Sequence, residues 1–288
     1  MSAWAGSAHL KIRHGISYFM LGLAGLCALV VVGALFYILG YLMKNGGTSI
    51  NLDFFTQLPK PVGETGGGMA NAIVGSMKLL LLASLIGVPV GVIGGIYMAE
   101  FSGKISAFIL QYTADLLNGV PSIVIGILAY TLVVLPMKHF SAIAGGFALG
   151  IMMIPITLRS TEEFLRGVPL ALREGSMALG ASKWRTIVSV VLPAAYRGIL
   201  TAILLSLARV AGETAPLLFT ALNNRYWSPG WNQPIASLPY MVWNYAISPY
   251  DDWHRQAWAA GLVLLAMVLL TNIVARVVLA RGSNAMPR

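Results

Sequence analysis

The chain has 288 residues, of which 57% are apolar and only 10% are charged, and its mean hydropathy is +0.77. Soluble domains carry about a quarter charged residues, so this composition excludes an ordinary water-soluble protein and indicates an integral membrane protein. The formal net charge of +9 does not require a nucleic-acid partner, because membrane proteins concentrate Lys and Arg in their cytoplasmic loops.

The first predicted element is an apolar run over residues 16–43, after a basic tail at residues 1–15 that contains Lys11 and Arg13. The core of a secretory signal is only about 7–15 residues long, so this longer run predicts a retained membrane span. Cys27 lies inside it and is the only cysteine, which excludes an intramolecular disulfide.

Five further apolar runs follow, and together they predict an all-α polytopic protein with six transmembrane helices. About 20 helical residues cross the hydrocarbon core of a bilayer. The later spans are expected at about 72–99, 105–135, 141–158, 194–222 and 257–280. We therefore expect a loop at 44–71, a transmembrane domain over 72–280 and a C-terminal tail at 281–288. The third span is interrupted at Gly119-Val120-Pro121, because proline disrupts a helix.

Lys and Arg are distributed unevenly over the two sides of these spans. If the N-terminus is cytoplasmic, twelve lie on the inner side and five on the outer side, with Lys78 and Arg209 inside spans. This bias predicts that both termini are cytoplasmic. The outer segment 223–255 is rich in Trp and Tyr, which favour the membrane–water interface. We expect an interfacial lid there rather than an aromatic substrate site.

The cytoplasmic segment 159–193 is polar and basic between two apolar runs. Thr161 with the acidic residues after it predicts a helix start. Gly180 predicts a flexible turn, and Pro193 predicts the start of the next span. The result is a helix–turn–helix at the membrane surface. The pattern alone also fits an ordinary interfacial amphipathic loop that binds anionic lipid head groups.

Two charges fall inside the fifth span. Arg209 lies near its middle and Glu213 follows four residues later, a spacing that places both side chains on one helix face. A charge at the bilayer centre costs on the order of 3 kcal/mol, so the pair is expected to face protein or water. It either locks this helix to a neighbour or forms part of a pathway. In a pathway, Arg209 would meet an anion with its planar donors and Glu213 would limit how tightly the anion is held.

The interrupted third span supplies a further candidate, Ser122. A helix that begins near Ser122, after Pro121, would expose backbone donors at its positive end, which suits an anion. Broken helices lie near solute sites in many transporters. A simple proline kink is the alternative.

Three segments resemble a known family. Glu174-Gly175 and Gly180, then nine residues and Val190-Val191-Leu192-Pro193, resemble the ATPase-coupling loop of ABC-importer permeases, where Gly175 replaces the usual Ala. The runs 208–220 (ARVAGETAPLLFT) and 118–126 (NGVPSIVIG) resemble the PstA-type permease subunits of bacterial phosphate importers. The resemblance implies the type I ABC-importer permease fold, with Glu174, Gly175, Gly180, Leu192 and Pro193 as coupling residues and Arg209, Glu213 and Ser122 as pathway residues.

The same resemblance implies a complex in the bacterial inner membrane. Its partners would be a cytoplasmic ABC ATPase dimer, a second homologous permease subunit of the PstC type, a periplasmic phosphate-binding protein, phosphate and membrane lipid. The chain has no G-x-x-x-x-G-K-[ST], so ATP and Mg²⁺ are expected in the ATPase and no cofactor in this chain. We expect no nucleic acid partner.

No catalytic or metal-binding pattern is present, because the four His residues are scattered and no nucleophile–base spacing occurs. This weighs against a membrane-embedded enzyme. Two alternatives stay open: the same architecture importing sulfate or molybdate, and a membrane signalling scaffold that reports solute levels.

Overall fold

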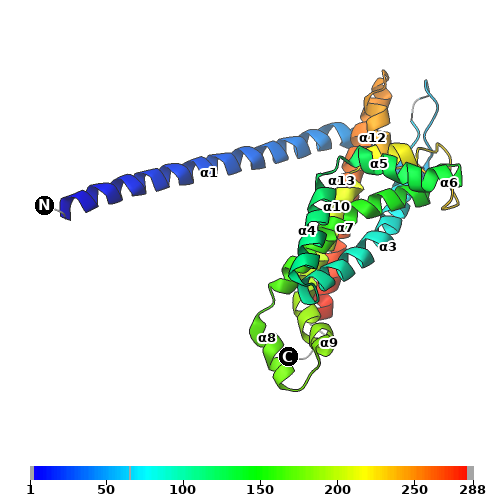
Figure 1. Cartoon of the computed structure of the whole chain (residues 1–288). Helices are drawn as coiled ribbons and strands as arrows, with labels where there is room; N and C mark the ends of the chain where they lie inside the picture. The colour runs from blue at the N-terminus through cyan, green and yellow to red at the C-terminus, as the bar shows by residue number, and fades with distance from the viewer. Residues whose placement is uncertain (1–2, 65, 284–288) are drawn as a thin grey trace.

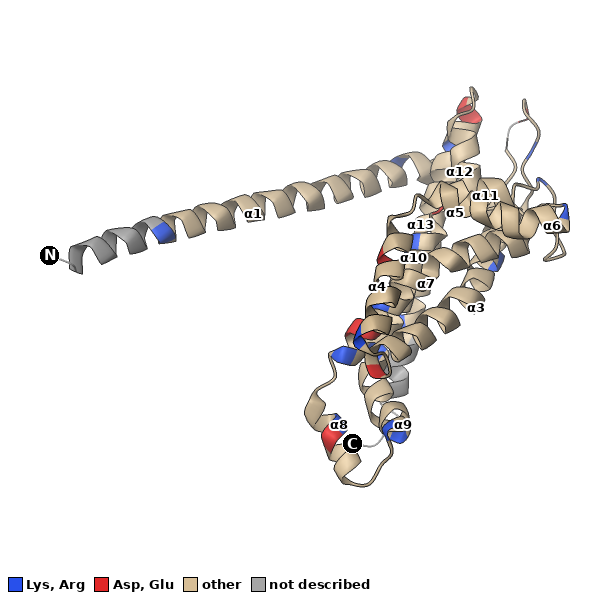
Figure 2. Ribbon diagram, viewed as in Figure 1, with Lys and Arg blue, Asp and Glu red and all other residues tan. Residues whose placement is uncertain are grey.

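The structure is a computed structural model that describes residues 3–64 and 66–283, and within these residues it contains helices and no strand. Figure 1 shows a bundle built from α3, α4, α7, α10 and α13, with the short α8 and α9 at one end. Helices α5, α6, α11 and α12 gather at the opposite end (Figures 1 and 2). The predicted all-α membrane fold is confirmed.

Helix α1 (Ala3–Gly46) projects away from this bundle (Figure 1). None of its most apolar window is buried. Residues 3–15, expected as a tail, continue the same helix, and residues 1–2 lie outside the described part. Its last turn rests on α13 (Asp251–Ser283), where a Cβ on Gly46 would lie 2.7 Å from the Trp258 carbonyl oxygen. The close approach therefore needs glycine at this position.

The loop expected at 44–71 contains two short helical elements. These are the 3₁₀ turn η1 (Gly47–Ser49) and α2 (Leu52–Thr56). Asn51 caps α2, since its side-chain oxygen accepts a hydrogen bond of 2.8 Å from the Phe54 amide. This cap explains why a helix forms in a segment whose apolar pattern did not predict one.

Helices α3 (Ala70–Glu100) and α7 (Ala142–Arg166) form the most closely packed pair in the bundle. A Cβ on Gly91 of α3 would lie 2.6 Å from Thr157 Cβ, and one on Gly146 of α7 would lie 2.3 Å from Leu82 Cβ. Small residues let membrane helices approach until their backbones nearly touch. The pair is therefore fixed in register by glycines on both helices.

The third span is broken as predicted. Helix α4 (Lys104–Gly119) ends before Pro121, and α5 (Ser122–Ala129) begins directly after it. A π-turn, η2 (Tyr130–Val134), and α6 (Leu135–Met137) complete the second half, which is bent by 101° from α4. Within the described residues, five helices are long and apolar enough to cross a membrane, and this pair makes six if it counts as one span.

The predicted helix start at Thr161 is wrong, because α7 continues to Arg166. Thr161 and Leu165 are buried, and Thr161 packs against Gly95 of α3. Arg159 and Arg166 of the same helix neutralise Glu162, so this acidic residue lies inside α7 and does not mark a helix start. The next helices are α8 (Leu170–Ala178), which follows Pro169, and α9 (Lys183–Thr186).

The prediction that Pro193 begins a span is also wrong. Helical backbone runs without a break from Lys183 through the π-turn η3 (Ile187–Val191) into α10 (Leu192–Ala211). The Leu192 amide donates to the Ile187 carbonyl, five residues back. This wider turn accommodates Pro193, which has no amide hydrogen to continue the α-helical ladder.

The fifth span is shorter than predicted, because α10 ends at Ala211 and Gly212 forms its C-cap. A break at residues 212–214 precedes α11 (Ala215–Thr220). Arg209 and Glu213 therefore do not share a face of one helix. Gly212 disfavours continuation and Pro216 cannot supply an amide to a continuous helix, so the break follows from the sequence.

The segment expected to form an interfacial lid contains a loop at 223–237 and α12 (Leu238–Ala246). The 223–237 loop covers the start of α7: the amides of Ala142 and Ile143 donate to the carbonyls of Gln233 (3.0 Å) and Trp231 (3.2 Å). Burial raises the pKa of the Tyr245 phenol in α12, and the Arg225 charge opposes this shift. Of the expected C-terminal tail, residues 284–288 lie outside the described part.

Candidate functional site

The two segments 118–126 and 208–220 meet in space where the third and fifth spans are broken. Gly126 of α5 lies against Pro216 of α11, and a Cβ on Gly126 would lie 2.6 Å from Pro216 Cα. Neither side offers a flexible side chain that could move aside. The contact of α5 with α11 therefore fixes the position of the break at residues 120–121 relative to the break at residues 212–214.

Arg209 lies in a small hollow beside this crossing. The hollow is lined from α4, the first break, α5, α7 and α10 by Leu117, Asn118, Val120, Ile125, Met152, Ile156, Arg209 and Val210. Asn118 and Arg209 are the polar side chains of this lining, and both are exposed in the single chain. In the described part of the chain, no hydrogen bond or ion pair reaches the Arg209 guanidinium. Its donors remain available to an anion.

The other two predicted pathway residues lie apart from the hollow. Glu213 sits on the break after α10, half-buried, and forms no ion pair with Arg209. Its amide donates to the Val210 carbonyl at 3.1 Å, which closes the end of the helix. Ser122 is the first residue of α5, half-buried, and does not line the hollow. The hollow thus joins Arg209 to the 118–126 segment through Asn118, Val120 and Ile125, not through Ser122.

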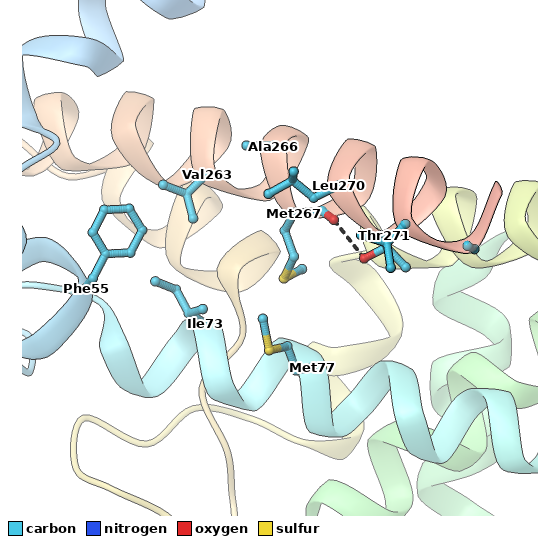
Figure 3. A pocket seen from close by; sticks show the side chains of 10 residues that line it. Phe55, Ile73, Met77, Val263, Ala266, Met267, Leu270 and Thr271 are labelled. Atoms are coloured by element: carbon cyan, nitrogen blue, oxygen red, sulfur yellow. Dashed lines mark hydrogen bonds between the residues drawn. The ribbon is translucent and has the colours of Figure 1, made fainter. Parts of the chain in front are cut away.

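A larger groove between α3 and α13 is apolar. Figure 3 shows Ile73 and Met77 of α3 facing Met267 and Leu270 of α13. Its one hydroxyl, on Thr271, donates to the Met267 carbonyl at 2.8 Å and is therefore already used (Figure 3). Because the lining offers an anion no charge and no free donor, we do not place the pathway here.

The α8–α9 segment (residues 170–186) is a helix–turn–helix, as predicted. Gly180 has φ +85°, a conformation that residues with a Cβ rarely adopt. Ser176 and Thr186 join the two arms by a hydrogen bond of 3.0 Å. Glu174 and Gly175 are exposed, and a Cβ on Gly175 would meet nothing within 4 Å in this chain. The predicted coupling residues of the first arm therefore face outward.

The apolar side chains of this segment are also exposed. Leu179 is 91% exposed, Leu170 71% and Leu172 48%. Exposed apolar side chains gathered on so short a segment mark a region that contacts another protein or the membrane. Leu192 and Pro193 lie elsewhere: they line an apolar groove between α3 and α10 with Val92 and Tyr196. The structure therefore separates these two predicted coupling residues from the exposed face.

Several charged residues lie toward the α8–α9 end of the bundle, as the coloured ribbon in Figure 2 shows. Glu162 of α7 is almost fully buried and accepts from Arg159 (3.1 Å) and Arg166 (2.9 Å). Arg159 also lies 3.4 Å from a carboxylate oxygen of Asp115 on α4. Burying Glu162 without these cations would be costly, so the network holds α4 against α7.

A second ion pair joins α3 to the α8–α9 segment: Arg173 of α8 donates to the Glu100 carboxylate at the end of α3. At the other end of α3, Lys78 donates to the Ser228 carbonyl (2.9 Å) and lies over the Trp231 ring. Sequence reasoning assigned no role to Glu100, Asp115 or Lys78. Their ion-pair and hydrogen-bond partners are 44 to 150 residues away, and the clue in the sequence was that Lys78 and Asp115 carry charges inside predicted spans.

Comparison with known proteins points to one family. Residues 91–282 match the family described as "Binding-protein-dependent transport system inner membrane component". The chain is 46% identical over 251 residues to the phosphate transport system permease protein PstA of Yersinia pestis, covering 87% of this chain and 85% of the relative. It is 43% identical over 272 residues to the PstA protein of Haemophilus influenzae, covering 93% of each.

A solved structure shares the fold. A chain from a bacterial ABC transporter involved in the import of the acidic polysaccharide alginate superposes with a TM-score of 0.60. The match covers 92% of this chain and 98% of that chain, at 16% identity. At this identity the match shows the fold alone, and the fold is that of an ABC-importer permease.

Proposed function

Because the chain belongs to the family of binding-protein-dependent transport system inner membrane components, we propose that it moves inorganic phosphate across the inner membrane as a permease subunit of an ATP-driven importer. The observation that carries the solute is the 46% identity, over 87% of the chain, to a phosphate transport system permease. The subunit itself performs no covalent chemistry. Hydrolysis of ATP, with its Mg²⁺, belongs to a partner ATPase.

In this proposal the phosphate passes Arg209 of α10, which lies beside the break of the third span. An unpaired guanidinium is disfavoured against lipid, so the Arg209 side chain must meet water, an anion or a partner subunit. The planar guanidinium can hold two phosphate oxygens at once. The Asn118 amide lines the same hollow and adds a neutral donor. A second, homologous permease subunit would cover this exposed face and complete the pathway.

Glu213 enters this mechanism only through a change at the break. It lies beyond the end of α10, so it can compete for the Arg209 guanidinium only if residues 212–214 rewind into the helix. Discontinuous helices supply such movable elements in transporters. A rewound state would weaken the hold on phosphate and release it, whereas the broken state leaves Arg209 free to accept the next anion.

Coupling would act through the α8–α9 segment. Two copies of a cytoplasmic ATPase would dock on its exposed face around Glu174, Gly175 and Gly180 and push on it as they close. The exposed leucines of this segment, Leu170, Leu172 and Leu179, support such docking. A periplasmic binding protein would deliver phosphate at the opposite end. The excess of Lys and Arg on one side of the predicted spans, twelve against five, supports an orientation with both termini in the cytoplasm.

The test is phosphate uptake at low external concentration in cells with and without the chain, with sulfate and molybdate as competitors. We expect uptake that requires the chain and resists both competitors. Uptake that does not depend on the chain would refute the proposed solute. Inhibition by sulfate or molybdate as strong as that by unlabelled phosphate would assign the importer to oxyanions in general.

A further inference from the structure

The end of α3 is attached to the first arm of the α8–α9 segment by a nearly buried ion pair. The side chains of Glu100 and Arg173 are 5% and 15% exposed. Besides the Glu100 carboxylate, the Arg173 guanidinium donates to the Leu165 carbonyl at 2.6 Å. With two acceptors fixed by different helices, the guanidinium can hold one position relative to both α3 and α7.

The second arm is attached to the same point. Lys183, the first residue of α9, donates to the backbone carbonyl of Glu100. Its ammonium also lies 4.9 Å from the centroid of the Phe101 ring. Since Ser176 and Thr186 already join the two arms, a force on the exposed face reaches the C-terminal end of α3 through both of them.

At its opposite end, α3 is attached to the 223–237 loop and to α12. The Asn71 side chain donates to the Asn224 carbonyl at 2.7 Å, and Lys78 donates to the Ser228 carbonyl. The Ser76 hydroxyl accepts the amide of Leu238 at 2.8 Å, at the start of α12. These bonds attach the loop that covers the start of α7 to the first three turns of α3.

Between its two ends α3 is held closely along α7. A Cβ on any of Gly87, Gly91 or Gly95 would lie within 2.6 Å of a Cβ on α7. Packed interiors transmit displacement rather than absorb it, because they have little free volume. A shift at Glu100 therefore reaches the far end of α3 about 45 Å away, at 1.5 Å per residue over 31 residues.

We propose that Glu100 and Arg173 are the positioning pair through which the α8–α9 segment moves α3, and that α3 carries this movement to the 223–237 loop. The pair acts at a distance from the hollow around Arg209 and touches no solute. The inference rests on the proposed function in one respect: it takes an ATPase to be the source of the movement. It adds a route that connects nucleotide binding by the ATPase to the 223–237 loop at the opposite end of the helix bundle.

The test needs a reporter on the loop that does not depend on the solute. With Cys27 replaced by Ser, Tyr226→Cys places a thiol at a position whose side chain is 74% exposed. The assembled complex with its ATPase, in vesicles, is labelled with a maleimide with and without ATP and vanadate. We expect nucleotide trapping to change the labelling rate by about fivefold, the lower end of typical coupling between sites.

The decisive variant is the double replacement Glu100→Gln with Arg173→Gln, because a single replacement would leave one buried charge unpaired. We expect it to hydrolyse ATP but to lose the nucleotide-dependent change in labelling. The exchanged pair, Glu100→Arg with Arg173→Glu, should regain part of that change. Arg197→Gln is the matched control, because Arg197 is exposed and its side chain forms no hydrogen bond or ion pair within the described residues.

Two outcomes would overturn the proposal: a full nucleotide response in the double variant, or a loss of response in Arg197→Gln as large as in the double variant. If the double variant fails to assemble, the exchanged pair decides, since an assembled exchanged pair without a response also contradicts the link. A failure of the proposed function can be distinguished from a failure of this link. A complex that transports no phosphate, yet loses its nucleotide response only when the pair is removed, refutes the solute and supports the link.

Discussion

Replacing Gly126 by Ala tests whether the contact of α5 with α11 sets the geometry around Arg209. The new Cβ would lie 2.6 Å from Pro216 Cα, whereas unbonded carbons meet at about 3.5–4.0 Å. The two helices must therefore separate by about 1 Å. Overpacking of this size costs about 1–3 kcal/mol, which is too little to prevent insertion of the chain.

The consequence for transport is larger than the consequence for stability. Separating α5 from α11 moves Val120 of the first break and Ile125 of α5 relative to Arg209 at the end of α10. Misplacing a binding group by about 1 Å can cost about 10²-fold in rate. We therefore expect phosphate uptake by Gly126→Ala to fall by about tenfold or more, while the protein stays at its normal level in the membrane.

Gly119→Ala is the matched control, since it makes the same change in the same broken span and a Cβ there would meet nothing within 4 Å. Its uptake should stay within about twofold of the unchanged protein, since exposed substitutions rarely cost more than about 0.5 kcal/mol. Initial rates of radiolabelled phosphate uptake, corrected for the amount of protein, provide the comparison. Normal uptake by Gly126→Ala, or equal losses in the two variants, would refute the reasoning.

Three further predictions concern single residues. Gly180→Val should assemble poorly with the ATPase and lose uptake, because a β-branched residue at φ +85° costs on the order of 1–3 kcal/mol; unchanged co-purification of the ATPase would contradict this. Asn118→Leu keeps the side-chain volume but removes the amide, so uptake should fall with a raised apparent KM for phosphate, and an unchanged KM would exclude Asn118 from the pathway. Ser122→Ala should retain most of its uptake, because Ser122 does not line the hollow, and a loss as large as that of Asn118→Leu would place the anion at the start of α5 instead.

Much of the fold could be predicted because hydropathy and helix breakers act locally. The apolar runs marked the spans, and Pro121 marked the break with α5 beginning at Ser122. Gly180 marked the turn of the α8–α9 segment. Each of these features depends on the residues at that point of the chain, so composition and spacing were sufficient.

The end of α10 was missed although the sequence carries a signal for it. Gly212 followed by Pro216 is the usual pattern of a helix C-terminus with a proline shortly after it. The apolar residues on both sides continue the hydropathy of a span, and this pattern predicts an unbroken helix. The error had a consequence for the site, because it paired Arg209 with Glu213 on a helix face that does not exist.

Other parts of the site depend on packing between distant segments. Asn118 and Arg209 are brought into one hollow only when α4, α7 and α10 assemble. Glu100 and Arg173 lie 73 residues apart, and their pairing depends on how α7 returns the chain to the end of α3. One sequence without its relatives gives no information on such contacts.

The central claim is that phosphate passes this subunit at Arg209, and uptake of radiolabelled phosphate by the reconstituted complex tests it most directly. We expect Arg209→Ala to abolish uptake, and Arg209→Lys to remain poor because an ammonium cannot hold two oxygens as a guanidinium does. Arg197→Ala should transport normally. Uptake by Arg209→Ala equal to that of Arg197→Ala, at matched protein levels, would contradict the account.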